Sequence, residues 1–167
     1  MSEPTDPVRM EIKGLMLDPS SNTPIVVLRD EESKVFLPIW IGVFEANAIA
    51  LRIEGVDPPR PMTHDLLHAS LVRLGATVEK VTISDLKENT FYALISLQLP
   101  AAGGVELDSR PSDAIALALR ANAPIFVLQS VLQEAKAVDL LTDETDEARL
   151  KKWLEQVSPD DLGKYTM

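Results

Sequence analysis

The chain has 167 residues, and its 16 Lys and Arg against 26 Asp and Glu give a formal net charge of −10. Its length fits one domain, and its 46% hydrophobic and 25% charged residues exclude a chain that is disordered throughout. The absence of cysteine excludes disulfides, thiolate zinc sites, iron–sulfur clusters and a cysteine nucleophile. The acidic balance argues against sequence-independent binding of nucleic acid, but it leaves open a nuclease that uses a metal ion or a local basic groove.

The two ends and the apolar runs of the chain predict its location. The first ten residues contain neither a basic segment nor an apolar segment, so we expect no secretory signal. No apolar run approaches the roughly 20 residues that a membrane-spanning helix needs. We therefore expect a cytoplasmic protein that does not contact a membrane.

The first third of the chain predicts three strands, over residues 8–17, 25–30 and 34–41. Because their connections are short, we expect them to pair antiparallel. Pro38 suggests a sheet edge or an irregularity, since proline cannot donate to a ladder. Apolar residues at helical spacing then predict a helix over residues 44–55, with Gly55 just past its last turn.

A linker of three prolines precedes a second predicted helix. Thr63 is a good N-cap for this helix over about residues 64–74. Its leucines are predicted to form one apolar face; they are Leu66, Leu67, Leu71 and Leu74.

The rest of the chain repeats strand signals and then returns to helices. Strands are predicted over residues 76–86, 91–99, 105–109 and 124–128. Helices are predicted over residues 110–122, with a proline in the first turn, and over 147–157, with a helical turn at 130–137. The acidic run at 139–147 is typical of a solvated loop or helix start rather than a calcium loop.

These elements predict an α+β fold with an antiparallel or mixed sheet and packed helices. A shift of 68 residues places residues 45–52 on 113–120 with five identities in eight positions. This similarity suggests an internal strand–strand–strand–helix duplication, although alanine-rich helices also match by chance. We expect residues 1–135 to form the main domain and residues 136–167 to pack on it as an acidic loop, an amphipathic helix and a polar tail.

One dense polar cluster lies at residues 60–65. Arg60, His64 and Asp65 combine a cation, a base that titrates near neutral pH and a carboxylate. The plainer interpretation is a capped helix start, in which Asp65 meets the positive end of the helix dipole. His64 and His68 also have the i, i+4 spacing of a metal-binding pair, but two histidines near a helix surface are more often unrelated to metal.

A second polar cluster lies at residues 107–113, where a strand ends and a helix begins. Asp108 and Asp113 are carboxylates of the kind that hold magnesium, and Arg110 has the paired donors that suit a phosphate. The plainer interpretation is a helix N-terminus that Ser109 or Ser112 caps, or an Arg–Asp ion pair that fixes the turn. Glu45 begins the equivalent helix of the first half and has the same two interpretations.

Four blocks of this sequence together resemble the bifunctional nuclease domain family, formerly a domain of unknown function. The blocks are "LPIWIGVFEANAIAL" (37–51), "RPMTHDLL" (60–67), "LGATVEKVTISDLKENTFYALISL" (74–97) and "DSRPSDAIALALRANAPIFV" (108–127). The resemblance covers about residues 8–135. It implies nuclease activity on RNA and DNA, which is attributed to plant members, and it carries over no catalytic assignment.

We therefore expect a metal-assisted nuclease that hydrolyses RNA or DNA. Asp108 and Asp113 would hold Mg²⁺ or Mn²⁺, and Arg60 and Arg110 would bind phosphate. The predicted catalytic residues are His64, Asp65 and Glu45. The alternatives are a non-catalytic regulatory or assembly module that forms homo-oligomers, which the acidic charge and low aromatic content favour, and a small-molecule binder. Self-association is expected in either case.

Overall fold

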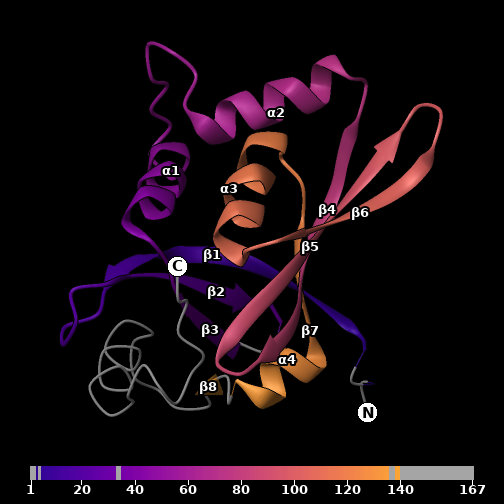
Figure 1. Ribbon diagram of the computed structural model, residues 1–167. Coiled ribbons are helices and arrows are strands. Elements are labelled where there is room, and N and C mark those ends of the chain that lie inside the picture. The colour runs from indigo at the N-terminus through magenta and orange to yellow at the C-terminus, as the bar shows by residue number, and fades with distance from the viewer. Residues whose placement is uncertain (1–2, 4, 33–34, 136–137, 140–167) are drawn as a thin grey trace.

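The computed structural model describes residues 3, 5–32, 35–135 and 138–139. Within these residues the structure confirms the predicted α+β class: eight strands form one mixed sheet in the order β6-β5-β4-β7-β1-β2-β3-β8, three helices pack against it, and a fourth packs on one of those helices (Figure 1).

The first three strands form an antiparallel meander, as their short connections predict. They are β1 (Pro7–Leu17), β2 (Pro24–Asp30) and β3 (Val35–Trp40). The two-residue strand β8 (Val138–Asp139) pairs with β3 only at Val35 and Phe36. Pro38 therefore lies in the part of β3 that β8 leaves unpaired, which agrees with the expectation of a sheet edge.

A second antiparallel meander follows. It consists of β4 (Thr77–Lys87), β5 (Thr90–Leu99) and β6 (Gly103–Ser109). The short strand β7 (Ile125–Leu128) joins the two meanders, because it pairs parallel with β4 on one side and antiparallel with β1 on the other. This single parallel pair makes the sheet mixed.

The helices are α1 (Val43–Ile53), α2 (Thr63–Arg73), α3 (Pro111–Ala121) and α4 (Gln129–Glu134). Figure 1 shows α1 beside α3, with α2 lying across the end of α3 and α4 at the opposite end of the molecule. Buried alanines line α1 and α3, and their small side chains let these two helices approach each other closely. This arrangement brings the N-terminal turns of all three longer helices into one region.

The order strand, strand, strand, helix occurs twice in the structure. The shift of 68 residues carries α1 onto the bounds of α3, since 43–53 becomes 111–121. An internal duplication stays a prediction, because element order alone does not establish a common origin.

One expectation about α2 is wrong. Its N-cap is Met62 rather than Thr63, and the Asp65 carboxylate accepts the Met62 N–H at 2.9 Å. None of its residues is buried, and the leucines of its predicted apolar face are exposed or partly buried: Leu66 is 60% exposed, whereas Leu71 is partly buried against the core. The helix packs on α3 through polar and half-buried side chains, which hydrophobic periodicity does not reveal.

Several predictions fall outside the described residues: the helix over 147–157, the acidic run from 140 onward and the packing of 136–167 on the main domain. Within the described ranges, no helix is long and apolar enough to cross a membrane. The cytoplasmic location stays a prediction.

A buried hydrogen bond joins the residue that follows β1 to the last residue of β3. Trp40 Nε1 donates to Asp18 Oδ2 at 2.8 Å, and both residues are buried. Burial alone would raise the pKa of Asp18, but donation from Trp40 and Ser20 outweighs burial and lowers that pKa from 3.8 to about 2. The ionised carboxylate is therefore the form that the fold prefers.

Asp18→Asn is expected to lower the free energy of unfolding at neutral pH by about 2 kcal/mol. Because the pKa of Asp18 is depressed in the folded state, its contribution is present above pH 3.8 and is lost as pH falls toward about 2. Urea unfolding at several pH values checks this. The difference in free energy of unfolding between wild type and variant should become smaller as pH falls from 3.8 toward about 2. A difference that stays constant over this range would contradict the lowered pKa of Asp18.

Candidate active site

The site begins where β6 passes into α3. Arg110 is the N-cap of α3, with extended backbone angles (φ −71°, ψ 144°), and Pro111 occupies the first turn, as predicted. Neither Ser109 nor Ser112 caps the helix, so that expectation is wrong: the Ser109 hydroxyl donates to the Arg110 carbonyl at 2.9 Å instead. The strand–helix junction therefore projects Arg110 toward the other helices.

The Arg110 guanidinium binds two carboxylates from different helices. Its Nε donates to Asp113 Oδ2 at 2.7 Å, and its Nη2 donates to Glu45 Oε1 at 2.9 Å. Asp113 lies in the first turn of α3 and Glu45 in the first turn of α1. These hydrogen bonds raise the pKa of Arg110 above its usual value, and the hydrogen bond to Asp113 has the largest effect.

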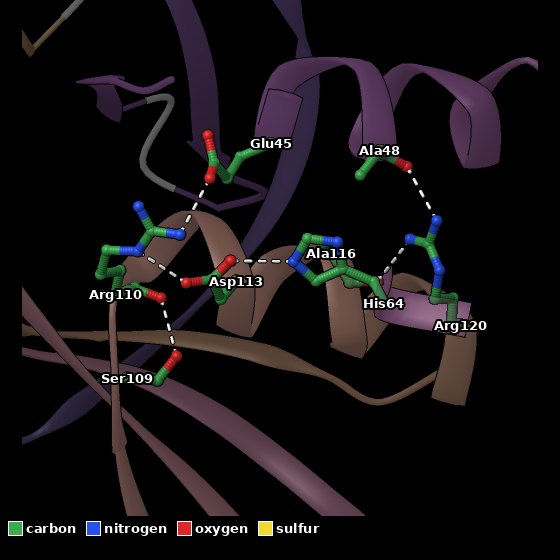
Figure 2. A network of polar contacts seen from close by, with 8 residues as sticks. All are labelled: Glu45, Ala48, His64, Ser109, Arg110, Asp113, Ala116 and Arg120. Atoms are coloured by element: carbon green, nitrogen blue, oxygen red, sulfur yellow. Dashed lines mark hydrogen bonds and ion pairs between the residues drawn. The ribbon is translucent and has the colours of Figure 1, made fainter. Parts of the chain in front are cut away.

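His64, in the first turn of α2, completes the chain of contacts. Its Nε2 lies 2.8 Å from Asp113 Oδ1, so Asp113 binds an imidazole with one oxygen and a guanidinium with the other (Figure 2). Burial would raise the pKa of Asp113, but the hydrogen bonds from His64 and Arg110 outweigh burial and lower it. We call Glu45, His64, Arg110 and Asp113 the polar network.

The polar network is graded from buried to open. Glu45 and His64 are largely covered, whereas the Arg110 side chain is 40% exposed. A cleft of about 440 Å³ opens beside the exposed end, and it is lined by Thr90, Phe91, Tyr92, Asp108, Ser109, Arg110 and Asp113. Its volume lies within the range of small-ligand sites. Two residues of the network, Arg110 and Asp113, thus line a cleft that a ligand can enter.

A second ion pair lies next to the polar network and locks the helices together. Arg120 Nε donates to Asp65 Oδ1 at 2.7 Å, its Nη2 donates to the Ala48 carbonyl at 3.2 Å, and its Nη1 donates to the Ala116 carbonyl at 2.9 Å. Figure 2 shows Arg120 spanning from α3 to α1. Burial would raise the pKa of Asp65, but donation from the Met62 backbone and from Arg120 outweighs it and lowers that pKa.

The structure brings most of the predicted site residues together. Glu45, His64, Arg110 and Asp113 form the polar network, and Asp108 lines the same cleft. Two predicted residues lie elsewhere within the described part of the chain. Asp65 belongs to the Arg120 pair, and Arg60 is exposed in the linker before α2.

The described part of the chain contains no ready-made metal cage. Within the described residues, no group of three or more His, Asp and Glu side chains is placed to hold a metal ion. His68 lines a separate hollow of about 280 Å³, away from the His64 contact with Asp113. One observation favours a further ligand: Glu45 Oε2 is buried and has no hydrogen-bond partner among the described side chains and backbone.

Sequence reasoning missed two residues of this region. Tyr92 lines the cleft, but strand alternation over 91–99 shows only that it lies on the face opposite Phe91. Arg120 ends the segment 113–120, which matches 45–52 under the shift of 68 residues. The arginine at the end of each matching segment, Arg52 and Arg120, was the available signal.

Fold and site together define an α+β protein in which side chains from the starts of three helices form one polar network, and the network residues at the start of α3 line a half-open cleft. The model of the Bifunctional nuclease domain family matches residues 26–139. An uncharacterized protein of Mycobacterium tuberculosis, Rv1829, is 40% identical over 164 residues, which cover 92% of this chain and 96% of the relative. The chain therefore belongs to the bifunctional nuclease domain family.

More distant relatives carry an activity in their names. Bifunctional nuclease 1 of Oryza sativa subsp. japonica is 28% identical over 114 residues, which cover 66% of this chain and 34% of the rice protein. Bifunctional nuclease 2 of the same plant is 29% identical over 124 residues, which cover 71% and 38% respectively. This chain thus spans little more than a third of the rice proteins that it matches.

Proposed function

We propose that this protein is a nuclease that hydrolyses phosphodiester bonds of RNA or DNA with the help of Mg²⁺ or Mn²⁺. The observation that carries the proposal is the polar network, in which Glu45, His64, Arg110 and Asp113 come together from three helices. Two of these residues, Arg110 and Asp113, line the cleft together with Asp108. The proposal would be weaker if each of these side chains capped its own helix on a different face of the molecule. Family membership supports the reaction class.

Arg110 is the phosphate-binding residue in this proposal. A guanidinium has five N–H donors, and the contacts with Glu45 and Asp113 use two of them. The side chain is partly exposed at the cleft, so the remaining donors are available to phosphate oxygens. The two carboxylates fix the orientation of the guanidinium before a substrate arrives, which lowers the entropy cost of binding.

His64 is the proton-transfer residue. A carboxylate kept ionised by its partners only accepts hydrogen bonds, so Asp113 holds the proton of His64 on Nε2. This leaves Nδ1 to accept or release a proton, directly or through a water molecule. Asp113 thus positions the imidazole and selects its tautomer.

Asp108 and Asp113 are the proposed metal-binding residues, because both line the cleft. Magnesium is usually held by one or two carboxylates together with water and substrate phosphate, so a donor set of this size fits the ion. When bound, the ion would neutralise phosphate charge and acidify water.

A nuclease assay tests the proposal. Wild type and an Asp108→Asn plus Asp113→Asn variant, purified identically, are given labelled single- and double-stranded RNA and DNA with magnesium, manganese or EDTA. We expect metal-dependent cleavage by wild type and none by the variant. Asp57→Asn is the matched control, because that carboxylate is 86% exposed in the linker and outside the cleft.

Two results would reject the nuclease proposal. One is no cleavage of any substrate by the wild type. The other is equal cleavage by the double variant, which would indicate a contaminating enzyme. Far-UV circular dichroism of both variants shows whether the fold is intact, so that loss of activity is assigned to the site.

We also propose a second candidate function, in which the protein is an assembly module that associates with copies of itself. The supporting observation is exposed apolar surface along α2 and at the start of α1. It includes Phe44 at 83% exposure and Leu74 at 76%, together with Val43, Leu66 and Val72. Exposed apolar surface of this kind is typical of protein–protein contacts.

Leu66→Glu is expected to shift the protein from oligomer to monomer, because the substitution places a charge in the apolar patch of α2. Multi-angle light scattering after size-exclusion chromatography measures the mass. Leu17→Glu, an exposed position on β1, is the control and should leave the mass unchanged. A monomeric wild type would contradict self-association.

A further inference from the structure

Tyr92 projects an aromatic ring from the sheet at the cleft. Along β5, its neighbours Phe91 and Ala93 are fully buried, whereas Tyr92 is 40% exposed and lies on the other face of the strand. The ring therefore does not fill the core. Only two aromatic side chains stand among the exposed large apolar residues of the described part of the chain, Tyr92 and Phe44.

One cation contacts the Tyr92 ring, and a second lines the same cleft. Lys87 Nζ lies 5.7 Å from the ring centroid, close enough for a cation–π contact, and Arg110 lines the same cleft as Tyr92. Asp85, the cross-strand partner of Tyr92, pairs with Lys87. The region of the cleft thus combines an aromatic ring with two cationic side chains, each of which is also paired with a carboxylate.

Cations near an aromatic ring have a specific use in nucleic-acid binding. Surfaces that bind single strands combine basic side chains, which contact phosphates, with rings on which unpaired bases stack. An uncharged base also avoids the repulsion that Asp108 and Asp113 exert on a bare phosphate. Bases of a duplex are already stacked inside the helix and cannot use such a ring.

We propose that Tyr92 stacks on a nucleobase, so that the cleft takes a single-stranded nucleotide segment with a phosphate at Arg110 and the adjoining base on Tyr92. This inference rests on the proposed nuclease function and adds the substrate form, single-stranded rather than duplex. Stacking is tolerant of sequence, because every base has an aromatic face. The cleft should therefore select strandedness rather than sequence.

Fluorescence anisotropy tests the inference without requiring cleavage. A labelled single-stranded oligonucleotide, a duplex and an abasic strand of equal length are titrated with protein at low ionic strength, in EDTA and separately in calcium. Wild type should bind the intact strand best. Tyr92→Ala should weaken that binding about tenfold and bring it to the level of the abasic strand. Tyr92→Phe keeps the ring and should bind like wild type.

Leu107→Ala is the matched control, because Leu107 has similar exposure on β6 but does not line the cleft. The inference is overturned if wild type binds no oligonucleotide, if Tyr92→Ala binds as wild type does, or if that variant weakens intact and abasic strands equally. Cleavage by a Tyr92→Ala variant with unchanged strand preference would reject the stacking role but keep the nuclease. Strand binding through Tyr92 without any cleavage would keep the stacking role but reject the nuclease.

Discussion

His64→Gln is expected to lower the rate of nucleic-acid cleavage roughly 10²–10⁴-fold, which is the usual contribution of general acid–base catalysis. Glutamine is similar in length and donates to the Asp113 carboxylate, so it preserves the contact that holds His64 in the network. It does not exchange protons near neutral pH. The expected result is therefore a loss in kcat with little change in KM, measured by steady-state kinetics on a labelled single strand.

His68→Gln is the control for this substitution. His68 lies one turn further along α2 and lines a different hollow, so its replacement should leave kcat within about twofold of wild type. Equal losses in the two variants would indicate damage to α2 rather than removal of a proton-transfer group. Full activity of His64→Gln would remove His64 from the mechanism.

Arg120→Ala is expected to lower the free energy of unfolding by about 3–5 kcal/mol, the usual effect of removing one partner of a buried ion pair. The Arg120 side chain is only 4% exposed and links Asp65 of α2 to the Ala48 carbonyl of α1. Its removal leaves the partly covered Asp65 carboxylate without its cation and both Ala48 and Ala116 carbonyls without this donor. Urea unfolding followed by circular dichroism measures the loss.

Arg52 provides a matched control, because it occupies the position equivalent to Arg120 under the shift of 68 residues. It pairs at 3.1 Å with Asp57, which is largely exposed, and such surface pairs contribute at most about 1 kcal/mol. Arg52→Ala should therefore be mild. Similar losses for Arg52→Ala and Arg120→Ala would contradict the assignment of Arg120 as the buried clamp between helices.

The strands and helices of residues 7–135 were largely predictable from local patterns. Alternation in "FYALISLQL" and helical spacing in "DAIALALR" each point to one element, and both elements are present. The α2 cap was not predictable, because Thr63 and Met62 are both possible starts until the reach of the Asp65 carboxylate is known. The exposure of Leu66 was also not predictable, because periodicity identifies an apolar face but not whether this chain covers it.

The candidate site was predictable in its residue types but not in its pairing. Asp113 is an acid at a helix start in any interpretation of the sequence, and its contact with His64 spans 49 positions along the chain. No local feature of the sequence distinguishes Asp113 from Asp65, because each lies in the first turn of its helix. Asp65 nevertheless pairs with Arg120. The choice between these two acids depends on which helix each faces.

The sequence by itself determined the α+β class, the family and the polar segments that carry ionisable side chains, because these follow from residue type and short-range spacing. Only the tertiary structure decided which of those side chains form a site. Small alanine side chains bring α1 against α3, and the position of α2 across the end of α3 places His64 beside Asp113 and Asp65 beside Arg120. Side-chain contacts extend only about 3 Å, so packing between helices, rather than order along the chain, selects the partners.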